Sequence, residues 1–321
     1  MERYTLESIP LSDLCRDDLY GVRYKSVCLP LDPAVAEKGV LIPLIVTGDK
    51  PYRIVSGHRR RQAAEKAGLS AVPALVLKET LPERELFLLS LMANEGQAYL
   101  FMDQMFVVRR AVNQFGFPPE EVMRTILPLL GAEPVRKNLD DLVAAGKLHP
   151  TLQEAISAEI LSSRGWQGLL RFSLSDQETF ARDIASNLCL SSSQLSQAGE
   201  WLKELSTETK MTLRAFLDSS GLRAVLETGP STDRRQKTDS FMKKLRALRY
   251  PRVTLRQEQF EAEARHLEKH LADVRIEAPP HFEEQGIILK LQIKDPSKLE
   301  DILRSLQENK TSINALLKTV L

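Results

Sequence analysis

Short apolar runs alternate with helical stretches over the first 80 residues. Leu41–Thr47, Tyr52–Val55 and Val72–Leu77 are rich in β-branched and aliphatic residues and predict strands. Asp32–Gly39 predicts a brief helix, with Asp at its start, Pro next and Gly just past its end. Alternation of the two periodicities predicts a small mixed α/β domain over residues 1–80 and an α+β chain overall.

From residue 81 to about 220 the apolar spacing is helical almost throughout. Glu83–Met92 and Asp103–Phe115 carry apolar residues at helical intervals. Two short helices, at 118–126 and from about 134 to 142, are joined by a turn that contains Gly131. These are the proportions of a helix-turn-helix, although such pairs are also common in all-helical domains.

The pattern changes again beyond residue 220. Residues 221–256 predict a linker, centred on Gly229–Asp233 and strongly basic: Arg234–Arg256 holds nine basic residues and one acid, Asp239. Such a run is either a solvated helix face or a contact to a phosphate backbone. Residues 257–321 predict a helix, two strands and a helix, an αββα unit with too little core to be stable alone. We therefore expect residues 257–321 to be a dimerisation domain.

The composition excludes some classes of protein but does not indicate a function. The 44 basic and 43 acidic side chains nearly cancel, so any nucleic-acid surface must be local. The three cysteines, Cys15, Cys28 and Cys189, are scattered, which favours a reducing compartment and argues against a zinc site. No apolar run is long enough to cross a membrane, so we expect a cytoplasmic protein with no bound metal of its own.

The candidate chemistry lies where a predicted strand turns into a basic helix. Gly57 lets the backbone turn tightly, and Arg59, Arg60 and Arg61 follow in the first helical turn. Free N–H groups and the positive end of the helix dipole favour an anion there. This predicts a phosphate site, and a solvated helix start that binds nothing is the alternative.

Gly57–Ala64, followed by Ala67-Gly68-Leu69 and Val72-Pro73, resembles the arginine motif of the ParB family of DNA-partitioning proteins. Gly39–Val46 resembles the glycine-to-proline motif before it, and Phe115–Val122 resembles the entry to the family's helix-turn-helix. The resemblance covers nearly the whole chain.

The resemblance implies an N-terminal domain of the ParB/sulfiredoxin fold that binds CTP, with Mg²⁺, and closes a dimeric clamp on double-stranded DNA. It also implies a homodimer through the C-terminal domain, a partner ATPase and a nucleoid-associated location. The positions that it assigns to nucleotide binding are Arg23, Gly39, Gly57, His58, Arg59, Arg60 and Asn94.

Three departures from the family pattern bear on hydrolysis. His58 stands where the family has glutamate, Ile42 where it has glutamine, and Ala93 where a later motif has a second glutamate. Without these groups to activate and orient water, we expect nucleotide binding with weak or no hydrolysis.

Two alternatives remain open at this point, an enzyme and an adaptor, and a third is excluded. Sulfiredoxin shares the fold, but Ser56 and Gly57 replace its cysteine and exclude thiol chemistry. The chain could be a nuclease or small-molecule kinase with His58 as its base. It could also be an adaptor that has lost nucleotide binding.

Seven residues are candidates for DNA contact. Asn is suited to adenine, and Arg to guanine or phosphate. The candidates on the second predicted short helix and on the basic stretch are Arg136, Lys137, Asn138, Arg234, Arg235, Lys243 and Lys244.

Overall fold

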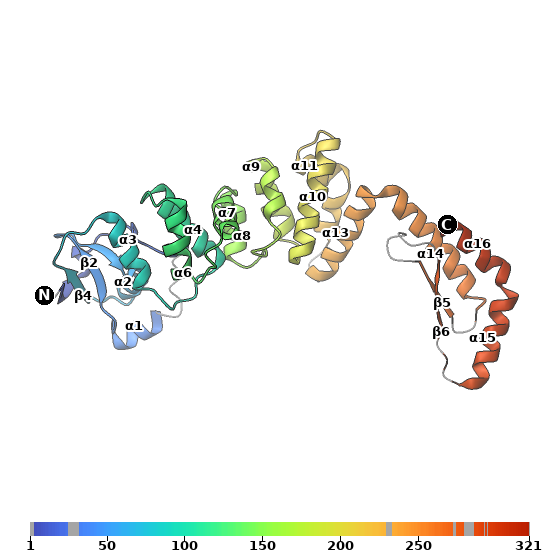
Figure 1. The fold of residues 1–321 in the computed structure, drawn as a ribbon, viewed down its shortest axis with the longest axis horizontal. Helices are drawn as coiled ribbons and strands as arrows, with labels where there is room; N and C mark the ends of the chain where they lie inside the picture. Colours follow the sequence, from blue (N-terminus) through green and yellow to red (C-terminus); the bar gives the residue numbers. More distant parts are fainter. Residues whose placement is uncertain are drawn as a thin grey trace. The chain divides into compact units, whose positions relative to one another are not determined.

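The computed structural model describes residues 3–24, 32–228, 233–271, 274–278, 286–291, 293 and 295–320. The chain divides into two compact units, Met1–Ser196 and Gln197–Leu321 (Figure 1). The units are mostly helical, with one small sheet in each, so the predicted α+β class is confirmed. Cys28 and the centre of the expected linker, residues 229–232, lie outside the described residues.

A four-stranded sheet forms the start of the first unit. Its strands are β1 (Tyr4–Pro10), β2 (Leu44–Thr47), β3 (Arg53–Ser56) and β4 (Ala71–Leu77). The spatial order is β1-β4-β2-β3, and only the β2–β4 pair is parallel. The apolar residues that predicted the strands, among them Leu44, Ile54 and Val72, are buried in its core.

Three short helices accompany this sheet: η1 (Leu11–Asp13), α1 (Asp32–Lys38) and α2 (His58–Lys66). Ala63 and Ala64 of α2 are fully buried in the same core. The small alanine side chains let the helix lie close to the strands, which fixes the start of α2 at the end of β3.

The helices that follow lie where the apolar spacing predicted them. They are α3 (Glu83–Met92), α4 (Phe101–Asn113), α5 (Pro119–Glu121), η2 (Val122–Ile126), α6 (Leu127–Leu129), α7 (Arg136–Ala145), α8 (Pro150–Ser157), η3 (Gln167–Arg171), α9 (Leu174–Thr179) and η4 (Phe180–Ala185). The segments α5, η2 and α6 follow without a break, and Gly131 turns the chain with φ of 68° before α7. Leu139 and Leu142 of α7 are buried. The helix-turn-helix stays a prediction, because two helices and a turn are shared by many folds.

The stretch expected to be a basic linker is helical instead. The second unit contains most of α10 (Ser192–Glu208), then α11 (Leu213–Ser219), α12 (Leu222–Leu226), α13 (Arg234–Arg249) and α14 (Pro251–Glu268). Thr238, Phe241 and Leu245 form a buried stripe along α13. This spacing is the amphipathic signal of a packed helix, whereas the sequence pattern had suggested at most a helix with a solvated face.

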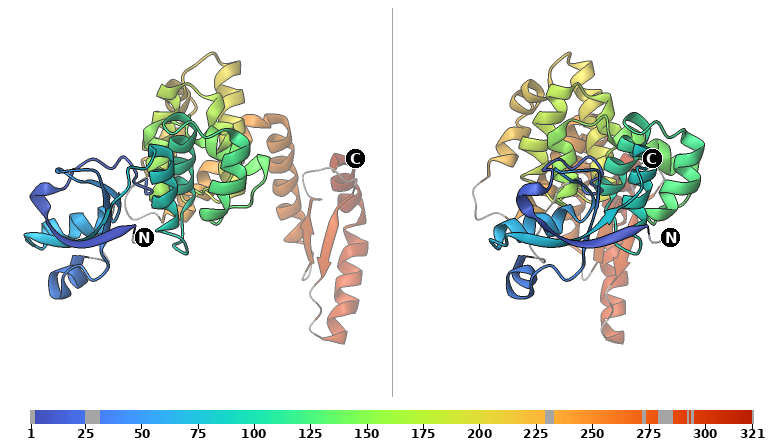
Figure 2. Two further views of the ribbon diagram at one scale, coloured as in Figure 1. Left: turned by 60° about the vertical axis from the view of Figure 1, so that its left-hand side comes forward. Right: turned by 90° about the vertical axis from the view of Figure 1, so that its left-hand side faces the viewer.

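The end of the second unit has one helix more than the expected αββα arrangement. It comprises β5 (Val274–Glu277), β6 (Ile288–Leu291), α15 (Pro296–Glu308) and α16 (Lys310–Val320), and β5 and β6 are antiparallel (Figure 2). Ile302 of α15 and Leu316 of α16 complete a core with Phe260 and Leu267 of α14. The extra helix exists because apolar residues recur after Asn309. Residues 279–285 of the expected loop lie outside the described residues.

None of the helices in the described part of the chain combines the length and hydropathy needed to cross a membrane.

Candidate functional site

The turn between β3 and α2 is shaped by Gly57. Its φ is 110°, a value that side-chain-bearing residues rarely adopt. A Cβ at this position would lie 2.8 Å from Cγ of the fully buried Leu44. Helical bonding begins with the amide of Arg61, which donates to the Gly57 carbonyl at 3.0 Å. The first amides of α2 have no acceptor within the helix, as at any helix start, and are therefore suited to an anion.

A cavity of about 90 Å³ adjoins this turn. Three segments contribute to it: the loop before Tyr24, the start of α2, and the end of α3 with the residues after it. The lining residues are Asp18, Gly21, Val22, Arg23, Gly57, His58, Arg59, Arg60, Ser90, Asn94 and Gln97. All the predicted nucleotide-binding residues except Gly39 lie around it. Gly39 ends α1 with φ of 72° and is not part of the lining.

Arg60 connects the helix to the segment before β2. Its Nη1 donates to the backbone carbonyls of Ile42, at 2.7 Å, and Pro43, at 2.5 Å. Burial lowers the pKa of this guanidinium from its usual value, but an arginine stays charged in a protein. Arg60 therefore links the start of α2 to the segment before β2, and it also lines the cavity.

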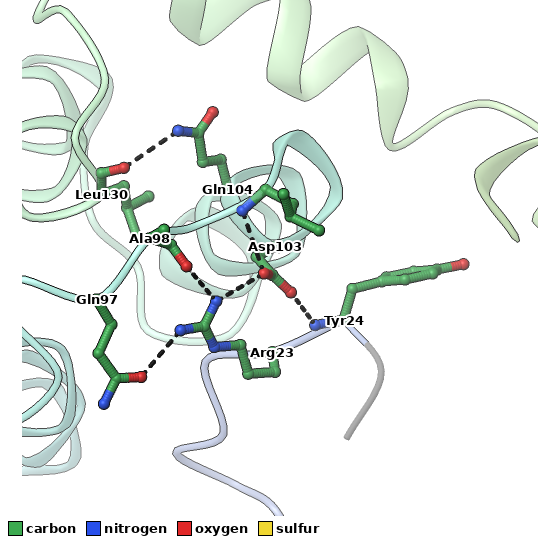
Figure 3. A network of polar contacts seen from close by, with 8 residues as sticks. Arg23, Tyr24, Gln97, Ala98, Asp103, Gln104 and Leu130 are labelled. Carbon is green, nitrogen blue, oxygen red and sulfur yellow. Dashed lines mark hydrogen bonds and ion pairs between the residues drawn. The ribbon is translucent and has the colours of Figure 1, made fainter. Parts of the chain in front are cut away.

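Arg23 is the centre of a polar network that fixes the chain between α3 and α4 (Figure 3). Its Nη1 donates to the Ala98 carbonyl at 2.7 Å and to Oδ2 of Asp103 at 2.8 Å, and its Nη2 donates to Gln97 at 2.9 Å. The other Asp103 oxygen accepts from the Tyr24 amide at 2.9 Å. Arg23 thus positions one wall of the cavity, which is a role beyond the nucleotide contact that was expected of it.

Asn94 brings the end of α3 against the glycine turn. Its Nδ2 donates to the Ser90 carbonyl at 2.7 Å and to the hydroxyl of Ser56 at 3.3 Å. Ser90 in turn donates to the Tyr20 carbonyl at 2.8 Å. Residues from three separate parts of the sequence are thereby held around one small space.

His58 lies in this cavity as a neutral imidazole. Burial lowers its pKa to about 4, and the neighbouring Asp18 carboxylate opposes that shift only in part. Its Nε2 is buried and has no hydrogen-bond partner among the described residues. Since a buried polar atom without a partner is costly, this nitrogen is suited to a bound ligand or a water molecule.

Sequence reasoning missed several residues of the cavity. Asp18 and Gly21 come from a loop with no motif, and Arg110 of α4 donates to both of their carbonyls, at 2.7 and 2.9 Å. Ser90 is a buried polar residue on the helix α3, which gives a weak signal. Gln97 stood inside the motif that supplied Asn94 and could have been included.

The predicted DNA-binding residues of the first unit lie at the start of α7. Arg136 and Lys137 are exposed, and Arg136 pairs with Asp140 one turn later at 2.9 Å. Asn138 donates to the Glu133 carbonyl at 3.1 Å. The start of α7 therefore presents two cations to solvent, with Asn138 bound to its own turn.

The other predicted DNA-binding residues lie on α13 in the second unit. Arg234, Arg235 and Lys243 are exposed. Lys244 differs, because its Nζ donates to the Gly221 carbonyl at 2.8 Å and so ties α13 to the start of α12. Arg234, Arg235 and Lys243 thus lie at the surface of α13, whereas Lys244 is half-buried against the start of α12.

The described residues contain no group of three or more His, Cys, Asp or Glu side chains placed to hold a metal ion.

Comparison with known proteins gives the class of this domain. Residues 29–95 match the ParB N-terminal domain family. The chromosome-partitioning protein ParB of Myxococcus xanthus is 36% identical over 94 residues, which cover 29% of this chain and 31% of that protein. Residues 29–95 are therefore similar to the N-terminal domain of ParB proteins.

The similarity is confined to part of each relative. The chain spans less than half the length of the curated relatives that it matches. Two C-terminally truncated ParB structures from Caulobacter crescentus are also similar. The one complexed to the centromeric parS site has a TM-score of 0.38 at 18% identity, covering 60% of this chain and 98% of that chain. The one complexed with CTP-gamma-S has a TM-score of 0.26 at 20% identity, covering 61% and 97%.

Proposed function

We propose that this protein is a partition-type DNA-binding protein whose N-terminal domain binds the phosphates of a nucleotide, CTP being the first candidate. The observation that carries the proposal is the cavity at the start of α2. Gly57 brings the backbone close, Arg59 adds charge, and His58 presents a buried nitrogen without a hydrogen-bond partner among the described residues.

The size of the cavity limits what it holds. Its volume of about 90 Å³ is that of about three water molecules. This is enough for a phosphate group and too little for a whole nucleoside triphosphate, so the ribose and base lie beyond it. The lining therefore selects a phosphorylated ligand, and the choice of base belongs to residues outside the cavity.

Magnesium bound with the nucleotide would need few ligands from the protein. Mg²⁺ is commonly held by one or two carboxylates together with the substrate phosphates and water. Asp18 lines the cavity and is the residue that would supply a carboxylate. When bound, the ion would neutralise phosphate charge.

Hydrolysis is not what this site is built for. A histidine with a pKa near 4 is a weak base at neutral pH, because proton transfer is most efficient when the pKa lies near the working pH. His58 also replaces the glutamate that the family resemblance implies at this position. We propose a nucleotide-binding protein with weak or no turnover, in preference to a nuclease or kinase that uses His58.

Exposed cations on α7 and α13 support double-stranded DNA as the partner. Arg136 and Lys137 stand at the exposed start of α7, and Arg234, Arg235 and Lys243 extend from α13. Contacts from such residues to phosphates provide affinity that falls steeply with salt. A nucleoid-associated location would follow from this binding.

An exposed apolar surface in the second unit supports a homodimer. On β6 it includes Ile288, Leu289 and Leu291, each 37–43% exposed, and on α15 it includes Leu299 and Leu303. Soluble monomers rarely leave large apolar patches in water. A second copy of the chain would cover these residues. The partner ATPase implied by the family resemblance remains a proposal.

Calorimetric titration of the full chain with CTP, ATP and GTP tests the nucleotide half. We expect Arg59→Ala to weaken binding by about tenfold or more, since it removes a charge-assisted contact. Arg16→Ala is the matched control, because Arg16 is almost fully exposed and lies outside the cavity. No binding of any of the three nucleotides at millimolar concentration would refute this half.

Fluorescence anisotropy with duplex DNA over a range of salt concentrations tests the DNA half. Arg136→Ala and Lys137→Ala should each lower the slope of log affinity against log salt by about one. Lys147→Ala, an exposed lysine just beyond the end of α7, should leave the slope unchanged. Absence of both DNA and nucleotide binding would favour the adaptor alternative.

A further inference from the structure

Two histidines lie close together at the end of α14, His266 in its last turn and His270 in the turn that follows Glu268. They are four residues apart in the sequence, and the turn after the helix brings the ring of His270 next to that of His266. Both side chains are exposed, and their ring centroids are 5.4 Å apart with the ring planes at 77°. Neither histidine belongs to the nucleotide cavity or to the proposed DNA surface.

The pair lies in an open groove between α14 and α16. The groove has a volume of about 750 Å³, and Glu263 lines it one turn before His266. Asn309, between α15 and α16, reaches the groove from the other side, and its Nδ2 donates to the His270 carbonyl at 3.4 Å. The histidines therefore have solvent access, polar neighbours and a fixed backbone.

We propose that His266 and His270 chelate a divalent transition metal ion, with Zn²⁺, Cu²⁺ and Ni²⁺ as the candidates. Imidazole nitrogen suits these ions and does not suit Mg²⁺ or Ca²⁺. Two histidines four residues apart on one helix are an established arrangement for zinc ligands, and here the turn after α14 brings the second ring to a comparable position.

The separation of the rings fits a single ion. With a metal–nitrogen bond of about 2.1 Å, each imidazole centroid lies about 3.2 Å from the metal. Two such rings with centroids 5.4 Å apart subtend about 115° at the metal, close to the tetrahedral angle. Small rotations of the side chains would bring the nitrogens onto the ion without moving the helix.

The site is an open one. Because no third His, Cys, Asp or Glu among the described residues completes a cluster, the two imidazoles hold the ion and water fills the remaining positions. Such a site binds reversibly and exchanges its ion readily. It shares no residue with the proposed nucleotide cavity or with the proposed DNA-binding residues.

Calorimetric titration of the full chain with Zn²⁺ tests the proposal, and Cu²⁺ electron paramagnetic resonance reports whether two nitrogens bind the ion. We expect His266→Gln and His270→Gln each to weaken binding by about tenfold or more, because either change turns a chelate into a single contact. Each variant should also remove the two-nitrogen spectrum. Circular dichroism should show unchanged folding, since both side chains are exposed.

His149→Asn is the matched control. His149 lies in the first unit, where its Nδ1 contacts the Thr151 hydroxyl at 2.8 Å, and asparagine can also cap the start of α8. This variant should bind Zn²⁺ as the parent chain does. Equal Zn²⁺ affinity in the parent and the His266→Gln/His270→Gln double variant would overturn the proposal, as would a parent chain that binds no Zn²⁺.

Discussion

Replacing Gly57 with alanine tests how the phosphate site is built. The backbone there has φ of 110°, and the new Cβ would lie 2.8 Å from Leu44 Cγ and 3.3 Å from Leu44 Cα. Leu44 is fully buried at the start of β2, so it has no room to retreat. The substitution therefore either shifts the β3–α2 turn away from β2 or unfolds the domain more easily.

The cost follows from three contributions. A side chain in left-handed backbone costs roughly 1–2 kcal/mol, and overpacking a close core costs about 1–3 kcal/mol. The reduced entropy of the unfolded chain returns about 0.4–1 kcal/mol. The free energy of unfolding should therefore fall by about 1–5 kcal/mol, and nucleotide affinity should fall with it because the first amides of α2 move.

Gly68→Ala provides the matched comparison. Gly68 also has a positive φ, 70°, but nothing lies within 4 Å of a Cβ built there. It should cost only about 1 kcal/mol or less. Urea unfolding of both variants, together with CTP titration, measures the difference. If Gly57→Ala loses no more stability than Gly68→Ala and binds CTP normally, close packing of the turn is not what shapes the site.

Other predictions concern charged and titratable groups. Because the folded-state pKa of His58 is below its unfolded value, the folded state binds fewer protons and loses stability as pH falls from about 6.5 towards 4. His58→Gln should remove about 1–2 kcal/mol of the stability lost between pH 7 and pH 5 in urea titrations. Asp103→Ala should destabilise the first unit by about 1–3 kcal/mol, since it leaves the mostly buried Arg23 without its carboxylate. Lys244→Ala should cost about 1 kcal/mol through its bond to the Gly221 carbonyl, with little effect on DNA affinity.

Each of these has a result that would contradict it. A pH dependence that is the same with glutamine at position 58 would mean that the imidazole titrates normally in the folded chain. Unchanged stability after Asp103→Ala would show that Gln97 and the Ala98 carbonyl suffice for Arg23. If the Lys244→Ala variant is as stable as the parent chain but binds DNA weakly, Lys244 contacts DNA and its bond to Gly221 contributes little to stability.

The sequence by itself determined the local structure of the first unit. The glycine turn at Gly57, the helix Glu83–Met92 and the strands around Leu44 and Val72 depend on backbone preference and apolar spacing within a few residues. The strand, the turn and the helix start around Gly57–Arg60 are contiguous in the sequence. This is why the sequence alone could predict a phosphate site there.

Tertiary structure decided which distant residues complete that site. Asp18 and Gly21 belong to a loop without periodicity, and only packing against Arg110 brings them beside His58. The neutral state of His58 likewise comes from burial by segments far along the chain.

The second unit shows the same division. Residues 221–256 were expected to form a basic linker, but contacts with neighbouring helices bury Phe241 and Leu245 and make α13 part of a core. The four-residue spacing of His266 and His270 is visible in the sequence, whereas the groove that leaves both rings accessible is formed by α14 and α16 together. The local sequence determines which helix or strand each segment can form. Packing decides which side chains stay exposed to a ligand, because burial depends on residues that lie far away along the chain.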